Sequence, residues 1–172
     1  MKVTITPTSL VWVKLKHEHT EVCKRLSSIL ESWSGTRYMI GLSQKGFGVD
    51  CVNFVFGVLD EMYREKKMRR AYSAAMCMNN PKGAFSALRT LLDDYQPNES
   101  ISNGTVEPGD IIVTSTKVGA PGHVMIAGPE QSELWHVYDD TVCTIGLGFF
   151  DSSCQIMNYF RTFRSQDKEK WV

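Results

Sequence analysis

Three side chains of this sequence have the residue types and the order of a nucleophile with its base. Cys51 follows Asp50 at the start of the apolar run "CVNFVFGVL", after a segment rich in glycine. With Asp50 as a helix cap, the N–H groups and the dipole of the first turn would favour a negative charge on the Cys51 sulfur, and the thiolate is the reactive form of cysteine. The same N–H groups are suited to an oxyanion that develops beside the sulfur. A small buried structural residue is the alternative interpretation of Cys51 taken alone.

A cysteine nucleophile needs a base, and two of the four histidines lie where a base could be held. His123 and His136 belong to "GHVMIAG" and "ELWHVY", which read as two strands of a hairpin with a four-residue loop, residues 129–132. In that register His136 lies opposite Met125 and on the same face as His123, because strand side chains alternate. A loop of odd length would place the two histidines on opposite faces. Either histidine alone could be a structural residue.

Together these side chains predict acyl transfer through a thioester, most simply the hydrolysis of an amide or peptide bond. In this hypothesis Cys51 is the nucleophile, and His123 takes the thiol proton and later protonates the leaving amine. His136 binds the other ring nitrogen of His123 and fixes its tautomer.

The elements that would position these residues are helices in the first half of the chain and strands in the second. Apolar spacing predicts a helix over residues 19–33, with Thr20 as a candidate N-cap and Gly35 as the stop. Its apolar positions are Val22, Leu26, Ile29, Leu30 and Trp33. A third helix is predicted after Asn80 and Pro81, a cap followed by proline.

The helix predicted to start at Cys51 has a single apolar stripe along one face. The residues of this stripe are Val52, Val55, Phe56, Leu59 and Met62. After it and the third helix, short apolar runs separated by turn residues predict strands, namely "DIIVTS", "HVMIAG", "ELWHVY", "VCTI" and "QIMNYFRTFR". Helices followed by a strand meander predict an α+β domain with an antiparallel sheet.

Length and composition indicate one domain, residues 1–172, with 42% hydrophobic and 22% charged residues. A formal net charge of zero argues against nucleic acid as a partner, and no apolar run approaches the roughly 20 residues of a membrane span. The five cysteines contain no C-x-x-C pair, and His17 and His19 read as a polar surface turn, so we expect reduced cysteines and no metal or other cofactor. The first residues have no secretory signal pattern, from which we expect synthesis in the cytoplasm.

Several motifs, in their order along the chain, resemble the NlpC/p60 superfamily of papain-like cysteine hydrolases, whose members mostly cut stem peptides of the cell wall. "GTRYMIG" is similar to the approach of that family to its nucleophile, and "VDCVNFV" is similar to its Asp-Cys-Ser-Gly helix start. "VEPGDIIV", "GHVMIAG" and "LWHV" resemble the turn and the two strands that follow. The resemblance implies a papain-like α+β fold in which N-terminal helices pack on an antiparallel, barrel-like sheet.

The resemblance also implies a Cys-His-His triad of Cys51, His123 and His136, with Tyr38 lining the substrate site. Two departures from the family pattern bear on specificity. Val52 and Asn53 stand where the family has Ser-Gly, which puts the usual γ-D-glutamyl bond in question. The segment before "EPGD" is also long, and we expect a helical insertion around residues 68–96 that forms a lid or an interaction surface.

Asp50 and Asn53, which flank the nucleophile, are further candidates for substrate binding. The leading hypothesis is a single-domain hydrolase of a peptide or small amide, such as a peptidoglycan fragment. A non-enzymatic member that binds a ligand in the cleft is one alternative, and a component of a phage tail or a similar assembly is another. The similarity to small phage-related members makes a phage-associated location one expectation, and the oligomeric state is not determined by the sequence.

Overall fold

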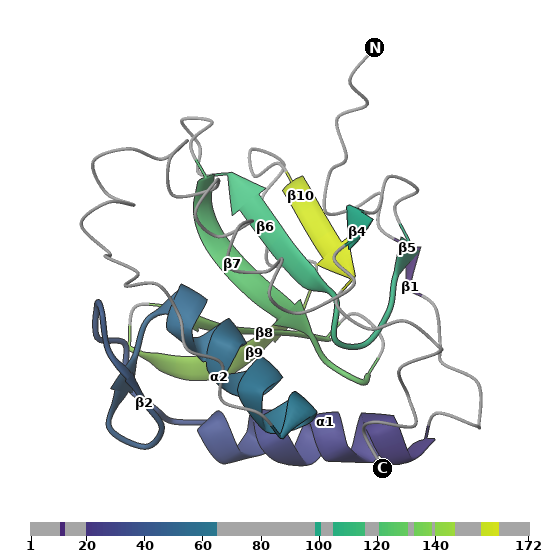
Figure 1. Cartoon of the computed structure of the whole chain (residues 1–172). Helices are drawn as coiled ribbons and strands as arrows, with labels where there is room; N and C mark the ends of the chain where they lie inside the picture. Colours follow the sequence, from purple (N-terminus) through teal and green to yellow (C-terminus); the bar gives the residue numbers. More distant parts are fainter. Residues whose placement is uncertain are drawn as a thin grey trace.

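The computed structural model describes the parts of the chain that build the proposed site. They are residues 11–12, 20–64, 99–100, 105–115, 121–130, 133–138, 140–146 and 156–161. Within them the chain forms helices packed on an antiparallel sheet, which confirms the α+β class (Figure 1). The predicted insertion around 68–96 with its helix, and also His17 and His19, lie outside the described residues.

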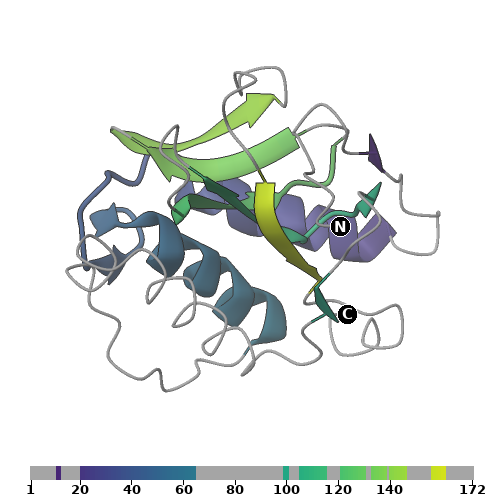
Figure 2. The ribbon, with the colours of Figure 1, turned by 90° about the horizontal axis from the view of Figure 1, so that it is seen from above.

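The main sheet has six strands in the order β4-β10-β6-β7-β8-β9, and all neighbours are antiparallel. The strands are β4 (Glu99–Ser100), β6 (Ile111–Ser115), β7 (Pro121–Ala127), β8 (Glu133–Tyr138), β9 (Thr141–Gly146) and β10 (Ile156–Arg161). Strands β8 and β9 run nearly crosswise to β6 and β10, so the sheet curls (Figures 1 and 2). Within the described strands the edge strands β4 and β9 do not pair with each other, so the expected barrel-like sheet is curved but open.

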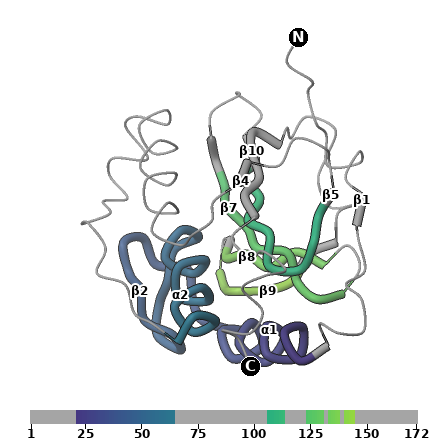
Figure 3. Tube along the Cα trace, turned by 45° about the vertical axis from the view of Figure 1, so that its right-hand side comes forward, coloured from purple at the N-terminus to yellow at the C-terminus, as the bar shows by residue number. Residues whose placement is uncertain are grey.

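Two small sheets flank the main one. Strand β1 (Val11–Trp12) pairs in parallel with β5 (Thr105–Val106). Strands β2 (Ser43–Gln44) and β3 (Gly48–Val49) form an antiparallel hairpin. This hairpin lies beside helix α2 (Cys51–Tyr63) in two views (Figures 1 and 3).

Helix α1 (Thr20–Trp33) follows the predicted apolar pattern. Its five predicted apolar positions, from Val22 to Trp33, are all buried. The helix stops before Gly35, whose φ of 76° is a left-handed conformation that glycine adopts without strain. Thr20 was predicted as the N-cap, but it is the first residue of the helix itself. A difference of one residue is usual at helix ends.

Helix α2 (Cys51–Tyr63) begins where Asp50 caps it, as predicted, and ends at Arg64 in the left-handed region. The prediction of a single apolar stripe is too narrow, because every residue from Val52 to Leu59 is buried. The physical reason is that α2 contacts α1, β7 and β8, so more than one of its faces is covered.

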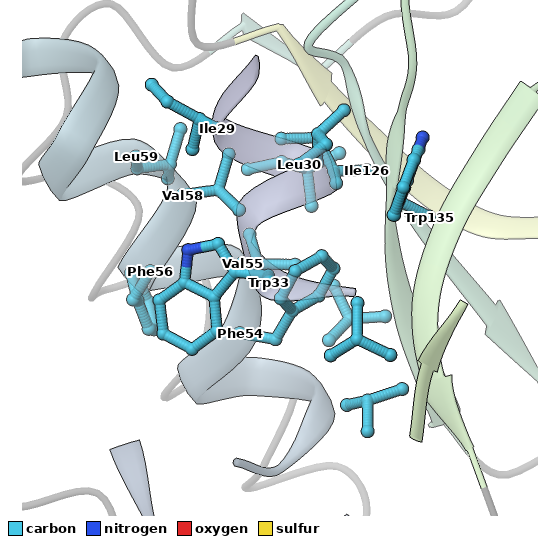
Figure 4. Packing of buried hydrophobic residues seen from close by; sticks show 14 of the residues in the cluster. Ile29, Leu30, Trp33, Phe54, Val55, Phe56, Val58, Leu59, Ile126 and Trp135 are labelled. Atoms are coloured by element: carbon cyan, nitrogen blue, oxygen red, sulfur yellow. The ribbon is translucent and has the colours of Figure 1, made fainter. Parts of the chain in front are cut away.

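The hydrophobic core lies between the helices and the sheet (Figure 4). Trp33 of α1 meets Phe54 of α2 edge to face, with ring centroids 5.8 Å apart, and Trp135 of β8 closes the core from the sheet. In the described part of the chain, neither helix has the length and apolar character needed to cross a membrane.

Candidate active site

Asp50 fixes the turn that presents Cys51. One carboxylate oxygen of Asp50 accepts from the backbone N–H of Asn53 at 2.8 Å. The other accepts from Asn53 Nδ2 at 2.9 Å and from the backbone N–H of Gly41 at 2.8 Å. Both side chains are buried, so they hold the start of α2 and tie it to the preceding loop. The predicted role of Asp50 and Asn53 in substrate binding stays a prediction.

Cys51 is the first residue of α2 and is partly buried against the hydrophobic core. In the first turn of α2, the N–H groups of Asn53 and Phe54 bond to Asp50. The sulfur therefore lies at the positive end of the helix dipole, as the sequence predicts.

Tyr38 lies close enough to Cys51 for the two side chains to interact electrostatically, and its predicted place in a substrate site stays a prediction. Its pKa is raised above 10.0, first by burial and then by the negative charges of Cys51 and Asp50. The phenol therefore stays protonated and can donate its O–H. At 38% exposed, the side chain is also open to a ligand.

The two predicted histidines touch. His123 Nε2 lies 2.9 Å from His136 Nδ1, and the ring centroids are 5.1 Å apart at 76°. Since this contact uses Nε2 of His123, the nitrogen that would serve a thiol is Nδ1. The contact is the one expected of a base and the group that orients it.

The hairpin register that carries this contact agrees with the prediction. Ile126 pairs with Trp135 and Ala127 with Leu134, and Gly128 N–H donates to Glu133 O at 2.9 Å. The two strands therefore pair in the predicted register. An even loop places both histidines on one face of the sheet.

Burial keeps both imidazoles neutral. The pKa of His123 falls from 6.5 to about 3, mainly because burial disfavours the imidazolium and secondarily because of His136. Burial also lowers the pKa of His136, whose side chain is only 5% exposed. At neutral pH one ring can therefore donate to the other across the Nε2–Nδ1 contact.

A backbone bridge joins the loop after α1 to the far edge of the sheet. Gly35 N–H donates to Val142 O at 3.1 Å, and Val142 N–H donates to Thr36 O at 2.8 Å. Tyr38 N–H donates to Asp140 O at 2.7 Å. Sequence patterns gave no sign of this bridge, because backbone groups of any residue type can form it.

The same loop also binds Val49, two residues before Cys51. Val49 N–H donates to Arg37 O at 2.9 Å, and Met39 N–H donates to Val49 O at 3.0 Å. The loop is thus held between β9 and the start of α2. Since α2 itself packs on β7 and β8, the nucleophile turn and the histidine strands belong to one packed unit.

Among the described residues, no group of three or more histidine, cysteine, aspartate and glutamate side chains is arranged to hold a metal ion.

Two crystal structures are similar to this fold. The NlpC/p60 domain of the peptidoglycan hydrolase SagA aligns with a TM-score of 0.51 at 16% identity, covering 77% of this chain and 96% of that one. A protein of Staphylococcus aureus subsp. aureus Mu50, described as similar to lipoprotein of the NLP/P60 family, aligns with a TM-score of 0.56 at 15% identity, covering 89% of this chain and 44% of that one. No protein-family model matches the chain, and no curated protein matches its sequence. The chain therefore has the NlpC/p60 fold, which confirms the fold that its motifs predict.

Proposed function

We propose that this chain is a cysteine hydrolase of the NlpC/p60 type that cleaves amide bonds in peptides through a thioester. The observation that carries the proposal is the 2.9 Å contact between His123 and His136 on the sheet against which the Cys51 helix packs. A protein that only binds a ligand has no need for a base with an orienting partner. Because SagA is a peptidoglycan hydrolase with the same fold, stem peptides of the cell wall are the first substrates to test.

In the first half of the proposed reaction, neutral His123 accepts the Cys51 thiol proton at Nδ1 while the sulfur forms a bond to the substrate carbonyl carbon. Nε2–H of His123 donates to Nδ1 of His136 throughout, so the new imidazolium keeps its orientation. Since burial lowers the pKa of His123, its imidazole is neutral before the reaction and can take up the thiol proton.

The tetrahedral intermediate then collapses to a thioester. His123 Nδ1–H gives its proton to the leaving amine as the C–N bond breaks. A water molecule next attacks the thioester, His123 Nδ1 takes a proton from it, and the acid departs as the sulfur regains a proton. The backbone N–H of Cys51 and the Tyr38 O–H are the groups we assign to the oxyanion.

The test is the rate of iodoacetamide alkylation as a function of pH, with the labelled cysteine located by mass spectrometry. Cys51 should react at pH values well below the roughly 8.5 of a free thiol, and His123→Ala should slow that reaction. Cys143 is a built-in control, because it is also partly buried and burial raises its pKa. Cys51→Ala should remove the label without changing that of Cys143.

A Cys51 that reacts no faster than Cys143 at pH 6.5 would contradict the proposal. If Cys51 does react early, hydrolysis of synthetic stem peptides by wild type and by Cys51→Ala is the next measurement.

A further inference from the structure

The loop that leads to the nucleophile exposes four large apolar side chains. Tyr38 is 38% exposed, Met39 39%, Ile40 54% and Phe47 58%. We call these four residues the apolar lip. They are the exposed large hydrophobic residues of the described part of the chain, and they all lie within ten positions. Such a concentration marks a contact surface more often than scattered exposed residues do.

The lip is held in place by the fold, so its exposure is fixed. Met39 N–H bonds to Val49 O, Gly41 N–H bonds to the Asp50 carboxylate, and Asp50 N–H bonds to Leu42 O at 3.4 Å. Gly48 adds a close contact, because a side chain there would collide with Met39. The apolar surface is therefore preformed, and a ligand would not have to order it.

The lip is continuous with the proposed site. Met39, which follows Tyr38, bonds to Val49, and Gly41 bonds to the Asp50 carboxylate, so the lip is attached to the two residues that directly precede Cys51. Two residues of the lip, Met39 and Ile40, follow Tyr38 directly along the chain. A group bound against the lip would therefore lie beside the reacting sulfur.

The charges around the lip favour an uncharged ligand group. The run "YMIGL" carries no ionisable side chain except the Tyr38 phenol, which stays neutral. Lys45, in the adjoining hairpin, is paired with Glu61 at 2.8 Å. An acidic or basic group held against the apolar side chains themselves would lose hydration.

We infer that the apolar lip is a specificity surface that binds a large apolar side chain of the substrate next to the scissile amide. This inference rests on the proposed function and separates the preferred peptides from the γ-D-glutamyl peptides usual for the family, in line with Val52 and Asn53 in place of Ser-Gly. The chain should favour leucine-like or phenylalanine-like residues near the cleaved bond over glycine or an acidic residue.

The experiment uses N-acetyl aminoacyl chloromethyl ketones that differ in one side chain: leucyl, phenylalanyl, glycyl and aspartyl. The rate of Cys51 labelling by each probe is divided by the rate with iodoacetamide, which carries no side chain. We expect the leucyl and phenylalanyl probes to label about tenfold faster than the glycyl and aspartyl probes, since burying such a side chain contributes this much or more.

Two variants locate the preference on the lip. Ile40→Ser and Phe47→Ser should each reduce the apolar preference by about threefold or more. Lys24→Ser, on the exposed face of α1, is the matched surface control and should keep the preference. Circular dichroism on each variant checks that the fold is intact.

The outcomes separate this inference from the proposed function. Slow iodoacetamide labelling of Cys51 would overturn the proposed function itself. Iodoacetamide could label Cys51 rapidly while all four probes react at equal rates or the aspartyl probe reacts fastest. Either outcome would overturn the inference about the lip and leave the proposed function standing. Equal probe rates together with binding to phosphatidylcholine vesicles that Phe47→Ser abolishes would assign the lip to a lipid surface instead.

Discussion

The contact between His123 and His136 sets two requirements on the same pair of rings. One ring must donate at 2.9 Å, and both must remain neutral in a buried environment at physiological pH. A neutral His123 is ready to accept a proton, which suits a general base. The same burial makes the stability of the folded protein sensitive to acid.

We predict that the free energy of unfolding falls as the pH is lowered from about 6.5 towards 3. Above this window His123 is neutral in both the folded and the unfolded chain, so it contributes no pH dependence. Within the window the unfolded chain binds a proton that the folded chain does not, which costs up to about 1.4 kcal/mol per pH unit. Urea unfolding at pH 7.5, 6.0 and 4.5 measures the loss.

Carboxylates also titrate in this range, so the informative quantity is the difference between wild type and His123→Gln. Glutamine can still hydrogen-bond to His136 but does not titrate. Wild type should lose more stability than His123→Gln between pH 7.5 and 4.5. Parallel losses in the two proteins would contradict the role given to burial of His123.

At the scale of elements, helices α1 and α2 pack together through a close contact between Trp33 and Gly57. Trp33 of α1 lies where a side chain at Gly57 of α2 would be, and its Nε1–H donates to Glu61 at 2.8 Å. Glu61 also pairs with Lys45, whose ammonium lies 5.4 Å from the centre of the Trp33 ring. One indole thus connects both helices and the hairpin that carries Phe47.

We predict that Gly57→Ala destabilises the protein by about 1–3 kcal/mol, because the new methyl group would collide with the six-membered ring of Trp33. In an open helix the same change would stabilise by up to about 1 kcal/mol, so the sign of the effect is diagnostic. Thermal or urea unfolding gives the sign.

The matched control is Gly57→Ala in the Trp33→Phe background, which lacks the indole atoms that meet the new methyl group. The penalty should shrink there, and the difference between the two backgrounds is the coupling of the two positions. An unchanged penalty would mean that the backbone of α2, and not the indole, makes Gly57 necessary.

At the scale of the whole molecule, the loop after α1 holds the two halves of the structure together. Residues 35–38 bond to β9 on one side, and residues 37 and 39 bond to Val49 on the other. The helices and the sheet therefore share backbone hydrogen bonds as well as a core. This chain spans 44% of the length of the S. aureus chain that it resembles in fold.

We predict that the amides of Tyr38 and Val142 exchange with solvent only when the whole domain unfolds. Both are donors in the bridge between the loop and β9, and breaking the bridge separates the loop from the sheet. Native-state hydrogen exchange should give these two amides the same opening free energy as the core of β7. The Phe47 amide in the hairpin turn is the control and should open at much lower free energy.

Fast exchange of Tyr38 with slow exchange of the core would show that the loop opens independently of the sheet.

The parts of this site that could be predicted are those fixed by neighbours in sequence. Asp50 caps α2 because a short acceptor side chain can reach the N–H three residues later, and the even loop puts both histidines on one face. The contact between loop and β9 could not be predicted, since it joins backbone groups far apart in the chain. The full burial of α2 was missed for the same reason, because the elements that cover a helix are not encoded in its own periodicity.

The exposure of the apolar lip could not be predicted for a different reason. "YMIGL" has no regular period, and apolar residues are expected to be buried, so nothing in the sequence distinguishes Ile40 from a core residue. Its exposure depends on bonds made by the backbone around it.

The bridge between Gly35 and Val142 also has a consequence for the order of events when the protein is made. The two residues are more than a hundred positions apart, and joining them closes a large loop, which is an entropic barrier and slows folding. During synthesis Cys51 leaves the ribosome long before His123 and β9 exist. For that interval the Cys51 thiol has neither His123 nor the sheet beside it. Any activity that depends on the two side chains together therefore begins only when the fold is complete.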